Sequence, residues 1–255
     1  MKPKTGIYLL LISAVLTGCL TTEYNVATRK QDIFFYSTEK EINMGRNISK
    51  QVQAELPIEK TPKLNEDIFD IGRQLSDVCD RQAINYYFYV IDKDEKNAFS
   101  LPGGYIYIYK GLIDLLNNDD QIAFVLAHEI GHIVARHSIK RLQASLGYNL
   151  LLLGSSQVEA SGNAPQAISL ALATILSGYS QEDELLADHL AVKYTKKAGF
   201  DSTAGIKVLE KLEEASRKEG PRRISYFRTH PFIQERIKNI KQNLGVPLDF
   251  KDIIN

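Results

Sequence analysis

The chain has 255 residues, with 31 basic and 31 acidic side chains and therefore no formal net charge at neutral pH. This balance excludes the basic field that binding to nucleic acid requires. Apolar residues make up 44% of the sequence, which is enough for a sizeable core, and no repeat or long low-complexity linker divides the chain. We expect one main domain, from residue 37 to residue 255.

The N-terminus has the pattern of a targeting segment. Two lysines precede an apolar run, residues 7–16, that is too short to cross a bilayer as a mature helix. The run ends in Leu-Thr-Gly-Cys19, which resembles a bacterial lipobox, where cleavage leaves the cysteine as a lipid-modified first residue. Residues 1–18 are therefore expected to be a lipoprotein signal peptide, Cys19 the lipidation site and residues 19–36 a tether. An ordinary secretory signal with an incidental cysteine is the alternative.

Cys19 is followed by Leu20, where a signal for inner-membrane retention would usually carry Asp. By resemblance to bacterial lipoprotein sorting, this favours the periplasmic face of the outer membrane. Cys79 is the second of two cysteines in the chain, so no internal disulfide is expected if Cys19 carries lipid. Cys79 lies in an apolar helical pattern and is expected to be a small core residue.

The first predicted elements of the domain are two helices. Thr38 and Glu41 have the spacing of a capping box, and the helix that they start is expected to end near Leu56, because Pro57 disfavours a helical residue before it. A second helix fits residues 65–82.

Two strands and a turn follow. Residues 84–91 are rich in β-branched and aromatic side chains and read as a strand. The Pro-Gly-Gly sequence at 102–104 predicts a turn between a short extended piece and a second strand, residues 105–109. Next comes a predicted helix over residues 111–117.

The helix after that carries the pattern H-E-x-x-H, and Asp119 or Asp120 is expected to cap it. His128 and His132 are four positions apart and share a helix face, so both imidazoles can reach one zinc ion at about 2.0 Å. Glu129 then lies beside the open position of the ion, where it can act as general base for a metal-activated water. The surrounding residues are apolar, and buried His and Glu are costly unless they are paired or bound to metal. The pattern predicts a hydrolytic metal site.

Peptidases with such a site commonly hold substrate as an added strand on a sheet edge. The extended piece before the turn is the candidate for that edge, with three proposed substrate-binding residues: Asn97, Ala98 and Phe99.

Beyond Ala135 the metal-binding helix is expected to continue. His137 is five residues past His132, about 140° further round the axis, and is expected to be a solvated surface residue. Two apolar stretches flank the polar run 155–165 and predict a helical hairpin over residues 142–178. We expect this hairpin to pack on the core, with contact to a membrane or a client protein as the alternative.

A catalytic zinc site of this kind needs a third protein ligand. Glu184 is the candidate, and Asp188, on the same face of a predicted helix that Gly199 ends, is placed to accept a hydrogen bond from the outer nitrogen of a metal-bound histidine. A solvated acidic helix start is the alternative for Glu184, and this segment by itself favours it. His189 points away from Glu184 and is expected to be structural.

The C-terminal part begins with a predicted helix over residues 202–218, followed by a charged segment, residues 218–228, that is expected to be mobile. Pro231 suits the first turn of a last helix, which places His230 at its cap. His230 and Arg236 are candidate donors to the oxyanion of the reaction. Alternatively, His230 reaches the ion and keeps the site latent, or has a capping role only.

Taken together, these motifs resemble a known family. The pattern H-E-x-x-H, followed about fifty residues later by E-x-x-x-D and preceded by N-A-F-x-x-P-G-G, is similar to the zinc metallopeptidases that include the CAAX prenyl proteases and their soluble bacterial relatives. The resemblance implies one zinc ion on His128, His132 and Glu184, with Glu129 as base, and an H-P-x-x-x-x-R segment lying over the active site. The prenyl proteases cross the membrane many times, so this chain is closer to the periplasmic lipoproteins of the family.

The sequence therefore predicts an α+β, mostly helical, zincin-like domain with a small sheet whose edge strand binds substrate. The expected function is that of a gluzincin-type zinc metalloendopeptidase, anchored by lipid, that hydrolyses peptide bonds in unfolded or misassembled envelope proteins. The alternative, from another class, is a lipid-anchored chaperone or binding protein for outer-membrane protein assembly in which proteolysis is latent.

Overall fold

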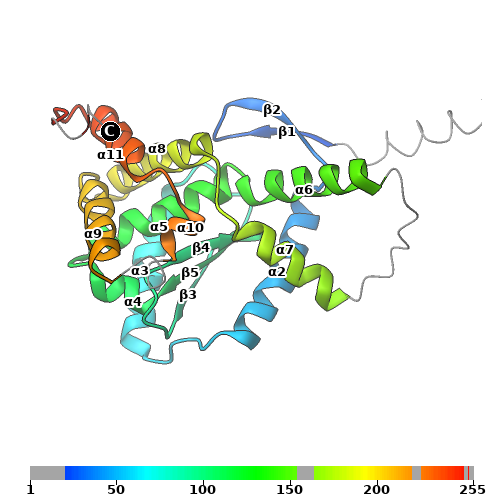
Figure 1. Ribbon diagram of the computed structural model, residues 1–255, viewed down its shortest axis with the longest axis horizontal. Helices are drawn as coiled ribbons and strands as arrows, with labels where there is room; N and C mark the ends of the chain where they lie inside the picture. Colours follow the sequence, from blue (N-terminus) through cyan, green and yellow to red (C-terminus); the bar gives the residue numbers. More distant parts are fainter. Residues whose placement is uncertain (1–20, 154–163, 220–224, 250–251, 253–255) are drawn as a thin grey trace, which may run out of the picture.

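A small sheet and the helices that cover it organise the computed structural model (Figure 1). The structure describes residues 21–153, 164–219, 225–249 and 252. Within these ranges the chain is mostly helical with two small sheets, which confirms the predicted α+β class. The predicted signal peptide and Cys19 lie outside the described residues.

The larger sheet has three strands in the order β3-β5-β4. Strand β3 (Tyr87–Ile91) is parallel to β5 (Tyr105–Tyr109), and β4 (Ala98–Leu101) is antiparallel to β5 on its other side. The predicted turn is confirmed as a short 3₁₀ segment, η1 (Pro102–Gly104), where Gly103 and Gly104 have φ angles of 75° and 99° that favour glycine. Strand β4 is therefore an edge strand, as predicted for the extended piece before the turn.

Ten helices are described, and their arrangement is shown in Figure 1. Their bounds are α2 Thr38–Glu55, α3 Pro62–Val78, α4 Lys110–Leu115, α5 Asp119–Val134, α6 His137–Leu153, α7 Ala164–Ile175, α8 Gln181–Ala198, α9 Ala204–Glu219, α10 Tyr226–Thr229 and α11 Ile233–Leu244. None of these helices has both the length and the apolar character that crossing a bilayer needs.

Helix α5 is the central helix and contains the H-E-x-x-H pattern. Every residue from Ala123 to Val134 is buried. Gly131 lets α8 approach closely, because a Cβ at this position would lie 3.0 Å from the backbone oxygen of Ala187. The close packing of α5 and α8 brings two sequence-distant motifs to one place.

Two predicted helix caps are wrong by one or two residues. Ser37, rather than Thr38, caps α2, and its side chain accepts a hydrogen bond from the backbone N–H of Lys40. Asn118 caps α5 by accepting from the N–H of Gln121, while the two aspartates lie in the first turn, where their charge favours the helix dipole.

Glu41 is not part of a capping box but the centre of a buried ion-pair network. Its carboxylate accepts two hydrogen bonds of 2.8 Å from Arg81, and Nε of Arg136 lies 2.8 Å from Oε2. The network joins α2, the segment after α3 and the end of α5. Removing one partner of a buried pair leaves the other charge uncompensated, which is strongly destabilising.

We therefore expect Glu41→Ala to lower the free energy of unfolding by about 3–5 kcal/mol. Urea denaturation followed by circular dichroism measures this change. Glu39→Ala is the matched control, because Glu39 is exposed on the same helix, and its effect should stay within about 0.5 kcal/mol. Equal stability of the two variants would contradict a structural role for the network.

Part of the predicted tether is ordered. Strands β1 (Thr21–Asn25) and β2 (Lys30–Phe34) form an antiparallel hairpin with Thr22 opposite Ile33. Phe34 is buried, and Asn25 donates a hydrogen bond to the backbone oxygen of Ala135. The hairpin is therefore attached to the C-terminal end of α5.

The sequence predicted that the helix with the H-E-x-x-H pattern continues beyond Ala135, but α5 ends at Val134. Arg136 has a φ angle of 59°, which ends α5 and starts α6 in a new direction. Ion pairs of Arg136 with Glu23 and Glu41 offset the cost of this conformation. The predicted helical hairpin is present as α6 and α7, which contact each other, and its connection, residues 154–163, lies outside the described residues.

The C-terminal part agrees with the sequence except at one cap. Gly199 ends α8 with a φ angle of 88°, as predicted. Residues 220–224 of the segment predicted to be mobile are outside the described part. Helix α11 begins at Ile233 with Phe232 as its cap residue, so His230 is not the cap of this helix but follows the short helix α10. The buried Cys79 is a core residue, as predicted.

Candidate metal centre and active site

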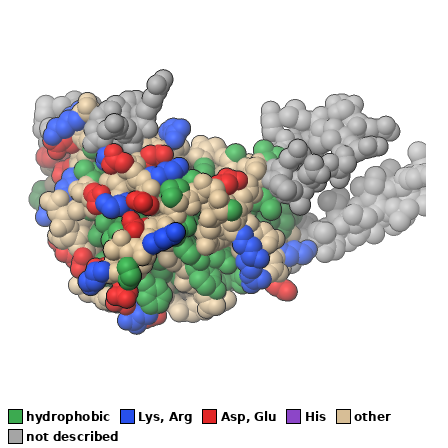
Figure 2. All heavy atoms as spheres, turned by 90° about the horizontal axis from the view of Figure 1, so that it is seen from below, with side chains coloured by type: hydrophobic (Ala, Val, Ile, Leu, Met, Phe, Trp, Pro, Cys, Tyr) green, Lys and Arg blue, Asp and Glu red, His purple; other side chains and the backbone are tan. Residues whose placement is uncertain are grey.

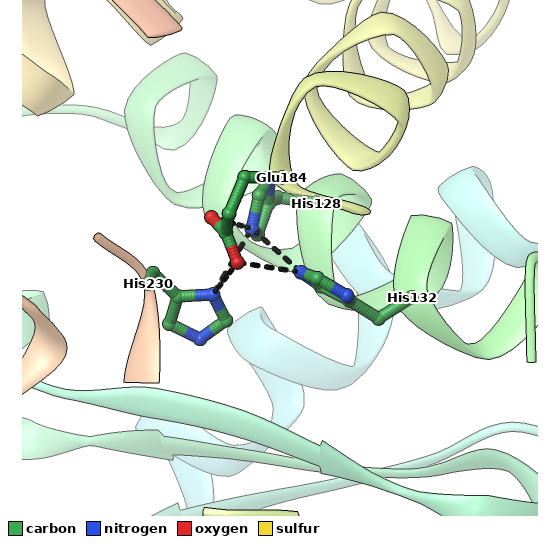
Figure 3. Close-up of side chains that lie close together, drawn as sticks. All are labelled: His128, His132, Glu184 and His230. Atoms are coloured by element: carbon green, nitrogen blue, oxygen red, sulfur yellow. Dashed lines mark hydrogen bonds and ion pairs between the residues drawn. The ribbon is translucent and has the colours of Figure 1, made fainter. Parts of the chain in front are cut away.

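Four side chains from α5, α8 and the end of α10 point at a common centre (Figure 3). Nε2 of His132 lies 3.0 Å from Nε2 of His128 and 3.4 Å from Oε1 of Glu184. Nδ1 of His230 lies 3.2 Å from Nε2 of His128 and 3.1 Å from Oε1 of Glu184. Ligands at 2.0–2.1 Å from a tetrahedral ion are about 3.3–3.4 Å apart, so these spacings fit a zinc ion at the centre.

The donor set and a neighbouring carboxylate also fit a metal ion. Imidazole nitrogens and a carboxylate oxygen are the ligands that zinc prefers. Glu129 is fully buried, and neither of its oxygens has a hydrogen-bond partner among the described residues. Nε2 of His230 is 3.2 Å from Oε1 of Glu129, but this approach does not meet hydrogen-bond geometry. A buried carboxylate without a donor is costly, and a bound ion with its water would supply what is missing.

His128 is oriented by a carboxylate on α8. Its Nδ1 is 2.8 Å from Oδ1 of Asp188, which leaves Nε2 facing the centre. Asp188 in turn accepts two hydrogen bonds of 2.8 Å from Arg236, and all three side chains are fully buried. A partner on the outer nitrogen fixes the ring orientation and tautomer of a metal-binding histidine.

His132 is oriented by His137, which the sequence analysis predicted to be a solvated surface residue. Nδ1 of His137 lies 2.8 Å from Nδ1 of His132, and Nε2 of His137 lies 3.2 Å from Oδ1 of Asp183. His137 is buried, not solvated, because the break at Arg136 turns the start of α6 back towards the site. No glycine or proline marks this break, so it could not be predicted from the sequence.

The charges of the site suit a cation. Burial would raise the pKa of Glu184, but His230 and Arg236 hold it well below its usual range. Burial also favours the neutral form of His132 and lowers its pKa well below the ordinary value. For His128, burial and Arg236 lower the pKa, but Asp188 and Glu184 outweigh them and raise it to about 9. A metal ion would compete with this proton for Nε2.

Arg236, a candidate oxyanion donor in the sequence analysis, instead pairs with the carboxylates of Asp188 and Glu184. It is fully buried, its guanidinium holds Asp188 from two nitrogens, and Nη1 lies 2.9 Å from Oε2 of Glu184. These contacts engage Arg236 with the two carboxylates that surround His128. We therefore assign it a positioning role.

Two tyrosines complete the walls of the site, and no sequence motif singles them out. Tyr179 stacks on His132 with ring centroids 3.9 Å apart, and its hydroxyl is 3.0 Å from Oγ of Ser138. Tyr226 stacks on His230 with ring centroids 4.5 Å apart. Both rings are buried and limit the access of water to the centre.

The edge strand lies against the segment that carries His230. Nε2 of His230 is 3.4 Å from the backbone oxygen of Ala98, and Oγ1 of Thr229 donates to Oδ1 of Asn97 over 3.3 Å. The backbone N–H of Tyr226 donates to the oxygen of Lys96. The edge expected to bind substrate, Asn97 to Phe99, is thus buried beneath residues 226–230. No histidine is visible on the face of the molecule shown in Figure 2.

An H-E-x-x-H helix beside an edge strand, with a glutamate from a second helix, is the arrangement of the zincin class of metal-dependent peptidases. A model of Peptidase family M48 matches residues 62–244. The chain belongs to this family, which confirms the resemblance seen in the sequence.

Several curated proteins are similar to this chain. The beta-barrel assembly-enhancing protease of Escherichia coli is 28% identical in an alignment of 223 positions that covers 80% of this chain and 44% of that protein. The chain thus matches less than half of the length of that relative. Metalloprotease YcaL of the same organism is 28% identical over 91% of this chain and 94% of its own length. Metalloprotease LoiP is 26% identical over 96% and 98%.

Proposed function

We propose that this protein is a zinc-dependent endopeptidase that hydrolyses peptide bonds in cell-envelope proteins. The observation that carries the proposal is the convergence of His128, His132 and Glu184 on one centre. The carboxylate of Glu129 lies beside it and makes no hydrogen bond to any residue that the structure describes. Membership of Peptidase family M48 supports the same activity.

The ligands would be His128, His132 and Glu184, and one zinc ion held by them would polarise the scissile carbonyl and activate water. Glu129 takes the proton from the attacking water onto a carboxylate oxygen and delivers it to the departing amine nitrogen. Asp188 and Arg236 keep the His128 ring in place while this happens, and His137 does the same for His132.

Substrate would bind in extended form along β4, where the backbone of Ala98 faces the site. An added strand uses main-chain hydrogen bonds, so it accepts many sequences and requires an unfolded segment. This supports unfolded or misassembled proteins as substrates. One relative is named a beta-barrel assembly-enhancing protease, and this name supports cell-envelope proteins as the substrates of this chain.

His230 would hold the enzyme latent. Its Nδ1 faces the same centre as the three proposed ligands, so it would fill the fourth position that a catalytic site leaves to water. The same segment covers the edge strand. One segment would therefore block both the chemistry and substrate binding.

Metal removal and return tests the function. Mature protein is incubated with a pool of denatured envelope proteins, then treated with a chelator and given zinc again, and the cut sites are mapped by mass spectrometry. We expect cleavage that is lost with the chelator and restored by zinc. A chaperone, the alternative function, would suppress aggregation of the pool in all three states without cutting it.

The proposed ligand set makes a further prediction for metal content. Elemental analysis of the purified protein should give about one zinc ion per chain. Glu184→Ala should lose most of it, because a ligand is removed and Nη1 of Arg236 loses its contact with the Glu184 carboxylate. His189→Ala, at an exposed position on the same helix, should keep it. Wild-type zinc affinity in Glu184→Ala would remove Glu184 from the proposed ligands.

We also propose that Cys19 is acylated and anchors the protein at the periplasmic face of the outer membrane. The lipobox-like sequence before Cys19 supports the acylation, and the following Leu20 supports the location. Mass spectrometry of the mature N-terminus should find an acylated Cys19. A free N-terminus at another residue would contradict the anchor.

A further inference from the structure

The β1–β2 hairpin has two faces of different character. Side chains alternate across a strand, and the register places Thr22 opposite Ile33 and Tyr24 opposite Gln31. All four are exposed, and so is Phe35, which follows Ile33 in the same alternation. The outer face thus carries three large apolar side chains: Tyr24 is 56% exposed, Ile33 60% and Phe35 44%. Seven large apolar residues are exposed in the described part of the chain, and three of them lie on this face.

The charges of the hairpin are sorted in the same way. Its two acidic residues lie on the inner face, where Glu23 pairs with Arg136 at 2.6 Å and Asp32 pairs with Lys140 at 2.7 Å. The basic residues Arg29 and Lys30 lie exposed at the turn. The outer face is therefore apolar and free of acidic groups, with positive charge at its end.

The hairpin follows closely after Cys19, and this position indicates what its outer face contacts. The described structure begins at Thr21, and one residue, Leu20, stands between it and Cys19. Two residues of extended chain reach at most about 7 Å. If Cys19 carries lipid, as proposed above, its acyl chains lie in the bilayer and the hairpin cannot leave the membrane surface. The anchor makes the contact intramolecular, so a small apolar face is enough.

We propose that the outer face of the β1–β2 hairpin docks on the lipid surface and orients the protease on it. Ile33 and Phe35 enter the boundary between headgroups and acyl chains, and Tyr24 lies at the headgroup level. Arg29 and Lys30 face anionic headgroups. This inference rests on the proposed acylation of Cys19.

The hairpin transmits this orientation to the active site because it is fixed to the metal-binding helix. Asn25 donates to the backbone oxygen of Ala135, the C-cap residue of α5, and Glu23 pairs with Arg136, the next residue. Gln143 of α6 holds the other strand through the N–H of Phe35. In Figure 1 the hairpin lies along one side of the molecule and the three-stranded sheet on the other. Docking would leave the sheet side open to the periplasm.

The chain contains no tryptophan, so a single substitution gives a site-specific fluorescent reporter. Tyr24→Trp and Phe35→Trp report on the outer face, and Tyr87→Trp, at a 39% exposed position on β3, is the matched control. Each acylated protein is reconstituted in vesicles of phosphatidylethanolamine and phosphatidylglycerol whose acyl chains carry bromine. Circular dichroism and thermal unfolding confirm that each reporter folds as the parent does.

We expect bromine quenching of Tyr24→Trp and Phe35→Trp to exceed that of Tyr87→Trp severalfold, with a shift of the emission to shorter wavelength. Equal quenching of the three reporters overturns the proposal. A shift without quenching also overturns it, because the face would then be covered by protein. Mass spectrometry of the same samples shows whether Cys19 is acylated, so a failure of the anchor can be told from a failure of the docking surface. If Cys19 is not acylated, the soluble mature proteins are mixed with the same vesicles, and absence of quenching there rejects the hairpin surface as well.

Discussion

Glu129→Gln is expected to lower kcat for peptide cleavage by about 10²–10⁴ while leaving metal content and folding unchanged. The substitution keeps the size of the side chain and removes only its ability to take a proton. Glu129 is fully buried beside the three proposed ligands. Its carboxylate makes no hydrogen bond to the described residues, and Nε2 of His230, 3.2 Å away, is out of hydrogen-bond geometry, so we expect the loss of its charge to leave the fold intact.

The measurement is cleavage of an unfolded envelope protein, with zinc content determined on the same samples. Glu182→Gln is the matched control, because Glu182 is an exposed carboxylate at the start of α8. It should cleave as the wild type does. Undiminished cleavage by Glu129→Gln with intact zinc would show that another group is the base. Absence of cleavage in the wild type as well as in this variant would instead favour the chaperone function.

His230→Ala is expected to raise peptidase activity, by about tenfold if the wild type is in its open state about one-tenth of the time. Alanine cannot fill the fourth position at the metal centre, and loss of the imidazole also removes the contact with the oxygen of Ala98. If His230 instead donates a hydrogen bond to the oxyanion, the same substitution lowers kcat by about 10²–10³. The sign of the effect therefore decides between the two roles.

The structure favours latency because Nδ1 of His230 lies among the proposed ligand atoms, 3.1 Å from Glu184 and 3.2 Å from His128. His189→Ala, at an exposed histidine, serves as the control and should leave activity unchanged. Unchanged activity and unchanged zinc affinity in His230→Ala would leave His230 with a structural role only. A restrained protease suits a promiscuous substrate site, since an edge strand reads the main chain more than the side chains.

In the latent arrangement, residues 226–230 must leave the edge strand before substrate can bind there. Tyr226 and Thr229 are hydrogen-bonded to Lys96 and Asn97, just before β4, and His230 lies 3.4 Å from the backbone oxygen of Ala98. A substrate strand and the 226–230 segment would therefore compete for the same edge. An unfolded protein that binds this edge would therefore weaken the hold of His230 on the centre. Because one segment contacts both the edge strand and the centre, we expect substrate binding to activate the enzyme.

Much of the site could be predicted from the sequence, because helical spacing is a local property. Positions four apart share a helix face whatever the rest of the chain does, which aligned His128 with His132 and Glu184 with Asp188. The Pro-Gly-Gly turn and the alternation after it likewise identified β4 and β5 without knowledge of their partners. Glu184 needed the family resemblance as well, since an acidic residue near a helix start is common without a metal.

The errors fall where a distant partner overrides a local pattern. Thr38 and Glu41 have capping-box spacing, but Glu41 pairs with two buried arginines whose charges would be costly to leave unpaired, and Ser37 takes the capping role. Residues 21–34 looked like a tether because the apolar face of the hairpin is short. They are ordered because their inner face packs on the end of α5.

By itself, then, the sequence determined the helix with the H-E-x-x-H pattern, the position of the proposed base on it, and the edge strand, since each depends on spacing within one element. Only the tertiary structure decided which groups support them. His137 reaches His132 because the chain turns at Arg136, and that turn is held by Glu23, 113 positions earlier in the sequence. Arg236 holds Asp188 and Glu184 because α11 packs against α8. Such contacts form between segments far apart in the chain, so no local period encodes them.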